Sequence, residues 1–188
     1  MKLASPLPVL IFAAIFFAAG TAVFYLLFAA YPSAEIFRVL YITFFTCLYH
    51  IAMRVAVGEA VTLYHRRRPF DYDSPFFRQR RFEKKLYKTL KVGKWKRYVI
   101  TAKPWQFDFD SRSPEELVFY MTQAEVVHEI IMILSFVPLL FIIPFGAAPV
   151  FIVTSVLAAL IDWLFVIVQR YNRPRVQRLM AYLESRQK

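Results

Sequence analysis

The chain has 188 residues, of which 59% are hydrophobic and 18% aromatic. This composition is outside the range of soluble globular proteins, and several apolar runs approach the roughly 20 residues that cross a bilayer core. The net charge of +11 is explained by basic loops beside membrane helices without invoking nucleic acid, and the single Cys47 excludes an internal disulfide framework. We therefore predict an all-α, polytopic membrane protein with four transmembrane helices and additional interfacial amphipathic helices.

Two apolar segments begin the chain. Residues 7–30 contain no charged residue and form a run too long for a signal peptide, so they predict a first transmembrane helix. Residues 36–63 predict a second one. His50 and Arg54 lie four residues apart near the middle or inner half of this helix, where they either line a polar cavity or only pack. The sequence does not decide whether this pair joins a functional site.

A basic loop over residues 65–116 follows. Within it, residues 77–91 have helical periodicity, with Phe82, Leu86 and Leu90 on one side and lysines elsewhere. A basic amphipathic helix of this kind is typical of a segment that lies in the membrane interface. Ser113 and Pro114 then match the start of a helix, with a hydroxyl residue before a proline.

Two further transmembrane helices are predicted at residues 117–143 and 150–168, with a kink at Pro138 in the first of them. Pro174 is interpreted as the first residue of a separate amphipathic tail helix, 174–187, on the membrane surface. The whole chain, 1–188, is predicted to form a single membrane domain.

The basic residues are distributed unevenly along the chain. The 65–116 loop holds fifteen of the 24 Lys and Arg residues, and the segment from Arg170 onward holds six, whereas the turns at 31–35 and 144–149 hold none. Cytoplasmic segments are enriched in Lys and Arg. We therefore expect a multi-pass protein of the cell membrane with the large loop and both termini in the cytoplasm.

A polar cluster interrupts the third predicted helix near its cytoplasmic end. Thr122, Glu125, His128 and Glu129 lie within two turns, with Glu125 and Glu129 four residues apart. A histidine beside carboxylates is the arrangement of a general base, because the acid orients the imidazole and stabilises its charged form. The alternative is that Glu125 and Glu129 form salt bridges with Arg170 or Arg54 and have only a structural role.

A second polar segment follows the fourth predicted helix at the same depth. It contains Gln169, Arg170, Asn172 and Arg173, whose side chains can bind a phosphate or a developing oxyanion. A catalytic metal is not predicted, because the chain lacks an HExxH motif and has no second histidine four residues from His128.

Five motifs occur in a characteristic order. They are Phe82-Glu83, Tyr87-Lys-Thr-Leu-Lys-Val92, Lys94-Trp-Lys96, Thr122-Gln-Ala-Glu125-Val-Val-His128 and Gln169-Arg-Tyr-Asn-Arg-Pro-Arg175. Over about residues 70–180 this pattern resembles the glycosyl-4,4'-diaponeurosporenoate acyltransferase family, bacterial membrane proteins of staphyloxanthin-type carotenoid biosynthesis. The resemblance implies an integral membrane enzyme that moves a fatty acyl group onto a hydroxyl of a lipid-linked sugar.

On this reading, His128 is the catalytic base with Glu125 or Glu129 beside it. Glu83, Lys94, Trp95 and Lys96 are expected to form a substrate-binding lid. No cofactor is expected beyond an anionic acyl donor such as acyl-CoA or a phospholipid, and the expected partners are membrane lipids and the sugar acceptor rather than nucleic acid. Two alternatives remain open: a methyl or prenyl transferase that uses the same site, and a non-catalytic lipid-binding or assembly subunit. The oligomeric state is not predicted.

Overall fold

The structure, a computed structural model, describes residues 7–187 apart from 67, 69, 73 and 100–102, so parts of the predicted 65–116 loop lie outside the described residues. The chain is 83% helical, and no strand occurs in the described part, which confirms the all-α prediction. The elements in chain order are α1 Leu7–Ala30, α2 Glu35–His65, α3 Arg81–Thr89, α4 Val92–Trp95, η1 Lys96–Tyr98, η2 Pro104–Phe107, α5 Pro114–Leu134, η3 Val137–Phe141, α6 Ile142–Phe145 and α7 Ala148–Gln187.

Among the described residues, four helical segments are long and apolar enough to cross a membrane. They are Pro8–Ala30, Glu35–His65, Pro114–Phe145 and Ala148–Arg186. This number agrees with the four transmembrane helices predicted from the apolar runs. α1 and α2 follow the predicted limits within two residues at each end, because hydropathy and the turn at Tyr31-Pro32 define both helices locally.

The third predicted helix, 117–143, is not continuous. α5 ends at Leu134, and the chain goes on through the short helices η3 and α6. Pro138 has no backbone N–H, and its ring clashes with the preceding turn, so a regular α-helix cannot pass through it unchanged. The break is in agreement with the kink predicted at this proline.

The predicted helix boundary at Pro174 is wrong. α7 runs without interruption from Ala148 to Gln187, with Pro174 inside it, so residues 150–168 and 174–187 belong to one helix. A proline in a helix removes one hydrogen bond, but packing on both sides can hold the helix together. Here Arg173 is 1% exposed and Val176 4% exposed, so the turns around Pro174 are anchored.

α3 also differs from the helix expected at residues 77–91. It is shorter, Arg81–Thr89, and the residues that it buries in the protein are Glu83 and Tyr87. Phe82 is 59% exposed, so the polar Glu83 side of α3, and not the Phe82 side, packs on the protein. A charged partner for Glu83 makes this possible, because a carboxylate is buried only when it is paired.

The described residues group into two compact units, each assembled from segments that are distant in sequence. The first unit contains Glu59–Glu129 and the chain from Trp163 onward, and the second contains Leu7–Gly58 and Ile130–Asp162. The helices α2, α5 and α7 therefore contribute residues to both units. The single membrane domain expected from the sequence stays a prediction.

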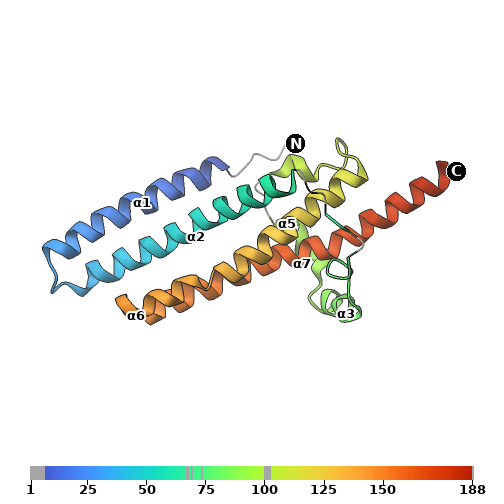
Figure 1. The fold of residues 1–188 in the computed structure, drawn as a ribbon. Helices are drawn as coiled ribbons and strands as arrows, with labels where there is room; N and C mark the ends of the chain where they lie inside the picture. The colour runs from blue at the N-terminus through green and yellow to red at the C-terminus, as the bar shows by residue number, and fades with distance from the viewer. Residues whose placement is uncertain (1–6, 67, 69, 73, 100–102, 188) are drawn as a thin grey trace. The chain divides into compact units, whose positions relative to one another are not determined.

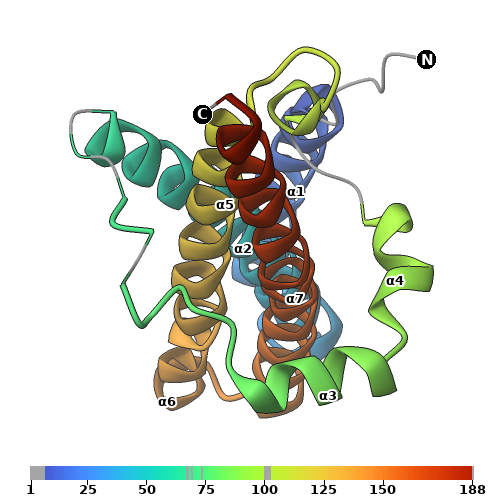
Figure 2. The same cartoon turned by 90° about the vertical axis from the view of Figure 1, so that its right-hand side faces the viewer.

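Two small apolar clusters hold the first unit together. In one, Leu117, Val118 and Met121 of α5 pack against Val176 of α7. In the other, Tyr87 of α3 and Val92 of α4 pack against Ile167 of α7. Figure 2 shows α3 beside α7, the arrangement that this second cluster produces. These contacts bring α3, α5 and α7 together in the first unit.

In the second unit, α1 and the N-terminal part of α2 run side by side in opposite directions (Figure 1). The ring of Phe44 on α2 lies directly against Gly20 on α1, where an added Cβ atom would be 2.0 Å from a ring carbon. Small residues allow close approach of membrane helices. Gly20 is therefore needed for this helix contact.

We expect Gly20→Ala to lower the free energy of unfolding by about 1–3 kcal/mol, because the new methyl group must displace the Phe44 ring. Gly58→Ala is the control, since, apart from the adjoining part of α2 itself, no atom of the described residues lies within 4 Å of the Cβ that this change would add. It should be neutral or stabilising by up to about 1 kcal/mol. Thermal unfolding in detergent measures both changes, and equal destabilisation by the two variants would contradict the packing at Gly20.

Candidate active site

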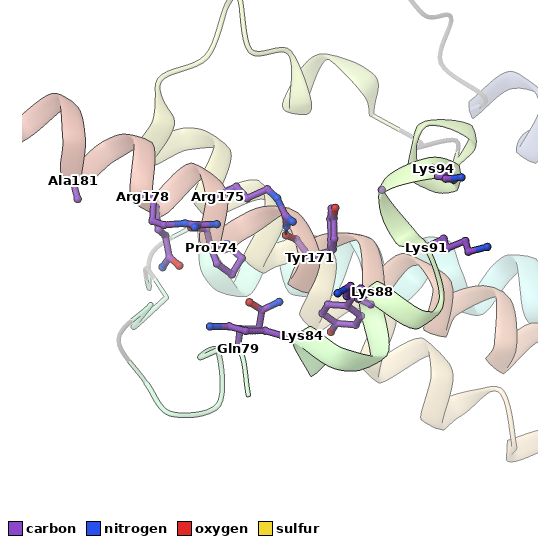
Figure 3. Close-up of a pocket in the computed structure, with 13 residues that line it drawn as sticks. Gln79, Lys84, Lys88, Lys91, Lys94, Tyr171, Pro174, Arg175, Arg178 and Ala181 are labelled. Carbon is purple, nitrogen blue, oxygen red and sulfur yellow. Dashed lines mark hydrogen bonds between the residues drawn. The ribbon is translucent and has the colours of Figure 1, made fainter. Parts of the chain in front are cut away.

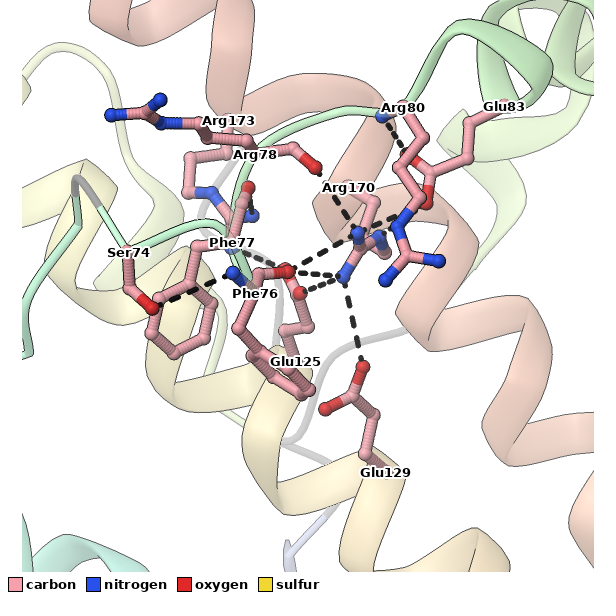
Figure 4. A network of polar contacts seen from close by, with 10 residues as sticks. All are labelled: Ser74, Phe76, Phe77, Arg78, Arg80, Glu83, Glu125, Glu129, Arg170 and Arg173. Atoms are coloured by element: carbon pink, nitrogen blue, oxygen red, sulfur yellow. Dashed lines mark hydrogen bonds and ion pairs between the residues drawn. The ribbon is translucent and has the colours of Figure 1, made fainter.

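Glu125 lies on α5 and is completely buried, at 0% exposure. Its carboxylate is held from two directions by α7: Arg170 Nη1 donates to Oε1 at 2.7 Å, and Arg173 Nη1 donates to Oε2 (Figure 4). A buried carboxylate loses its hydration, and two charge-assisted hydrogen bonds replace it. Glu125 therefore ties α5 to α7.

Arg170 is the central residue of the cluster. Besides Glu125, it donates to Glu83 of α3 at 3.0 Å, and it lies 3.8 Å from the carboxylate of Glu129. Its guanidinium group also reaches the backbone carbonyl oxygens of Phe76 at 3.3 Å and Arg78 at 3.4 Å. The side chain thus joins α3, α5, α7 and the segment that precedes α3.

Arg173, which lies on α7 like Arg170, is the last member of the cluster. It donates to the carbonyl oxygen of Phe77, and its guanidinium carbon lies 5.2 Å from the centre of the Phe77 ring. Its Nε has no hydrogen-bond partner among the described residues. Arg173 is therefore committed to the protein interior, like Arg170. We call Glu83, Glu125, Glu129, Arg170 and Arg173 the Glu125 cluster.

Glu129 differs from the other two acids of the cluster. Its side chain is 23% exposed, against 0% for Glu125 and 9% for Glu83, and its ion pair with Arg170 is the longest, at 3.8 Å. The cluster contains three carboxylates and two guanidinium groups, so the charge of one acid is not matched within it. Glu129 is the carboxylate of the cluster that a substrate could reach.

His128 is half-buried and precedes Glu129 on α5. Its ring stacks on Phe165 of α7, with the ring centres 4.3 Å apart and the planes tilted by only 8°. This stack fixes the plane of the imidazole and leaves its edge, with both nitrogens, away from the ring face of Phe165. The imidazole ring of His128, which the sequence suggests as a base, is therefore held in a defined orientation by Phe165.

The guanidinium groups of both arginines are occupied by protein carboxylates. Arg170 and Arg173 both face carboxylates in this structure. The alternative in which Glu125 pairs with Arg170 agrees with the geometry, whereas Arg54 pairs elsewhere. The predicted substrate-binding role of the two arginines stays untested, and their observed role is to hold helices together.

The other polar residues predicted on α5 and α7 lie around the cluster rather than in it. The Thr122 hydroxyl is fully buried and donates to the carbonyl oxygen of Val118 in its own helix at 2.8 Å. Gln169 is 7% exposed. Asn172 accepts a hydrogen bond from Lys96 Nζ at 2.7 Å. Thr122 therefore has a structural partner, and Asn172 connects α7 to the chain after α4.

The residues predicted to form a lid lie in α3, α4 and η1. Glu83 binds Arg170, and Trp95 Nε1 donates to the carbonyl oxygen of Leu90 at 2.9 Å. Lys96 binds Asn172 and lies 5.2 Å from the centre of the Tyr171 ring. Lys94 lines a pocket formed with α7. The four residues are therefore positioned against α7, while movement as a lid stays a prediction.

His50 and Arg54 belong to the second unit. Arg54 forms an ion pair with Asp162, which is 1% exposed, and also donates to the carbonyl oxygen of Ala158 at 3.4 Å. His50 is 7% exposed, and both its ring nitrogens lack a hydrogen-bond partner among the described residues. The pair thus lies at a buried polar contact between α2 and α7 that includes no residue of the Glu125 cluster.

Three features of the site were missed at the level of sequence. They are the carbonyl oxygens of Phe76, Phe77 and Arg78, the pairing of Glu83 with Arg170, and the position of Tyr87. The positions of backbone carbonyl groups cannot be recognised in a sequence. The i,i+3 spacing of Arg170 and Arg173, however, could have predicted that both arginines pair with the same carboxylate, Glu125. In the part of the chain that the structure describes, no group of three or more His, Cys, Asp or Glu residues is arranged to hold a metal ion.

The fold and the site together define a class: a helical protein with four helices able to span a membrane and a buried carboxylate–arginine cluster beside a histidine. The glycosyl-4,4'-diaponeurosporenoate acyltransferase family model matches residues 73–182, well over half of the chain, and the chain belongs to this family. The protein is thus an acyltransferase. No curated protein and no solved structure matches it.

The family match covers α3 to α6 and α7 as far as Tyr182, and hence every residue of the Glu125 cluster, together with His128. α1 and α2 lie outside the matched range, and so do His50 and Arg54. The part of the chain that defines the family is therefore the part that builds the candidate site.

Proposed function

We propose that this acyltransferase moves a fatty acyl group onto a hydroxyl of a glycosylated lipid at the cytoplasmic surface of the membrane. The observation that carries this proposal is the position of half-buried His128 beside Glu129, the most exposed carboxylate of the Glu125 cluster, within the family-matched segment. A general base beside a carboxylate is what activation of a hydroxyl requires.

In the proposed reaction, His128 accepts the proton of the acceptor hydroxyl as its oxygen attacks the acyl carbonyl carbon. A new ester C–O bond forms, and the bond between the acyl carbon and the donor's sulfur or oxygen breaks. The leaving group departs with the electron pair and takes the proton from the imidazolium. Glu129 follows His128 on α5, where consecutive side chains do not face each other, so its carboxylate stabilises the charged imidazole through its negative charge rather than through a direct hydrogen bond.

The buried members of the cluster are proposed as positioning residues. Glu125 and Arg173 are at most 1% exposed, so they reach neither donor nor acceptor in this conformation. By fixing α5 against α7, they hold His128 in its stack with Phe165. Precise orientation of a catalytic group contributes to rate because the reactive geometry is already present when the substrate binds.

The cytoplasmic location is part of the proposal. The basic residues of 65–116 and of the segment after Arg170 flank the cluster in sequence, and both segments are expected on the cytoplasmic side. α7 has 40 residues, and a helix of this length measures about 60 Å against about 30 Å of hydrocarbon. Its C-terminal part therefore extends beyond the bilayer core, with both termini proposed to be cytoplasmic.

The test is an acyl-transfer assay with the purified protein in lipid nanodiscs. A glycosylated polyene lipid is the acceptor, and acyl-CoA or phospholipid is offered as donor in separate reactions. We expect a product heavier than the acceptor by one acyl group minus water, identified by mass spectrometry. A product that gains a methyl or prenyl mass, or an unchanged acceptor with either donor, would contradict the proposal.

A further inference from the structure

A pocket of about 860 Å³ lies in the first unit between α3, α4 and the C-terminal part of α7 (Figure 3). This volume is in the range of small-molecule binding sites. The pocket is distinct from the Glu125 cluster, since none of the five cluster residues lines it.

The lining is strongly basic. Six of the described lining residues are cationic, and none of the described lining residues is acidic. The cations come from both sides: Lys84, Lys88, Lys91 and Lys94 from α3 and α4 with their junction, and Arg175 and Arg178 from α7. None of the six forms an ion pair with a described residue. Like charges around one pocket repel each other, so an anion in the pocket would be stabilised.

The nearest acid on α3 does not neutralise this charge. Glu83 is buried and paired with Arg170 on the side of the Glu125 cluster. Tyr87 lines the pocket, and burial together with Glu83 raises the pKa of its phenol to about 12. The phenol is therefore uncharged at neutral pH. The pKa of Lys96, next to the pocket, is lowered by burial and by Arg175, as expected where positive charge is in excess.

We propose that this pocket binds the phosphate groups of a nucleotide-bearing acyl thioester, the chemistry of acyl-coenzyme A. Coenzyme A carries one monophosphate and one diphosphate, about four negative charges in total, and Lys and Arg are the side chains that recognise phosphate. A phospholipid headgroup has a single phosphate and an apolar body, which matches a lining dominated by cations less well. This inference rests on the proposed acyl-transfer function and names its donor.

The position of the pocket agrees with that role. Tyr87 lines the pocket and lies one turn after Glu83 on α3, and Glu83 pairs with Arg170, so α3 contacts both the pocket and the Glu125 cluster. Tyr171, which also lines the pocket, directly follows Arg170 on α7. The nucleotide end of a donor bound here would lie next to the residues that position His128.

The experiment measures binding of coenzyme A to the full chain in zwitterionic nanodiscs by calorimetry. The test variant is Lys88→Ala/Arg178→Ala, which removes one pocket cation from each side. The control is Lys85→Ala/Arg186→Ala, which removes the same charge from exposed positions of the same two helices outside the pocket. We expect the test variant to bind about tenfold more weakly and the control to bind like the wild type.

Ligand truncation gives a second readout that needs no variant. Coenzyme A should bind more tightly than dephospho-coenzyme A, and pantetheine, which has no phosphate on it, should not compete. In the acyl-transfer assay, the Lys88→Ala/Arg178→Ala protein should show a higher KM for acyl-CoA with unchanged kcat. Absence of acyl transfer would overturn the proposed function but would leave the binding result readable.

The inference itself is overturned if coenzyme A does not bind the wild type, or if both double variants bind it equally. It is also overturned if pantetheine competes as well as coenzyme A. Binding to anionic-lipid vesicles that depends on Lys88 and Arg178, without coenzyme A binding, would show that a lipid headgroup is the occupant instead.

Discussion

Replacing Glu125 by alanine is expected to lower the free energy of unfolding by about 3–5 kcal/mol. The carboxylate is 0% exposed and faces both Arg170 and Arg173. Its removal would leave the guanidinium group of Arg173, 1% exposed, buried without its acidic partner. A buried, unpaired charge is far more costly than the loss of one surface ion pair.

The matched control is Glu129→Ala, one turn further along α5. Its carboxylate is 23% exposed and lies 3.8 Å from Arg170, so its loss should cost about 1 kcal/mol or less. Chemical unfolding in mixed micelles, followed by circular dichroism, gives both values. Equal destabilisation by the two substitutions would refute the central structural role of Glu125.

A double replacement distinguishes charge from shape. Glu125→Leu alone should be strongly destabilising, whereas Glu125→Leu combined with Arg173→Met should recover part of the loss, because an apolar pair needs no compensation for burial. No recovery in the double variant would mean that the contact of Arg173 with the Phe77 carbonyl, rather than its pairing with Glu125, dominates.

His128→Phe is expected to lower kcat of acyl transfer by about 100- to 10,000-fold, the contribution typical of a general base. Phenylalanine keeps the stack on Phe165, so the change removes the proton acceptor and leaves the packing. KM for both substrates should change little, since the imidazole is assigned to the chemical step rather than to binding. Steady-state kinetics in nanodiscs, with a thermal unfolding curve as the folding check, gives these values.

His65 provides the matched control for this substitution. It is a half-buried histidine of the same unit whose ring stacks on Phe70, with centres 3.7 Å apart, but it lies at the end of α2, outside the Glu125 cluster. His65→Phe should leave kcat unchanged. If His128→Phe is folded and retains wild-type kcat, His128 is not the base, and Glu129 becomes the residue to test.

Much of the fold was predictable because its determinants are local. The limits of α1 and α2 follow from uninterrupted apolar residues, and the break after Leu134 follows from Pro138. The same local rule failed at Pro174, where α7 continues because Arg173 and Val176 on either side are buried against other segments. A proline inside a helix costs free energy through one lost hydrogen bond and a steric clash. The helix continues where the packing of the surrounding residues outweighs this cost.

The candidate site was predictable as a set of residues, but their roles were not. Glu125, His128 and Glu129 were identified from their spacing, yet nothing in that spacing tells which acid is buried and which is accessible. The orientation of α5 about its axis directs Glu125 toward the arginines of α7 and leaves Glu129 partly exposed. Likewise, α3 turns Glu83 rather than Phe82 inward, because Arg170 supplies the opposite charge.

By itself, the sequence determined the helical class, the four apolar segments and the resemblance to the acyltransferase family, because hydropathy, proline and motif order are properties of neighbouring residues. Only the tertiary structure decided that Arg170 and Arg173 are held by carboxylates and that the basic residues of α3 and α7 line one pocket. Such pairings depend on how far each helix is rotated and shifted against the next. These quantities are set by the packing of segments distant in the chain.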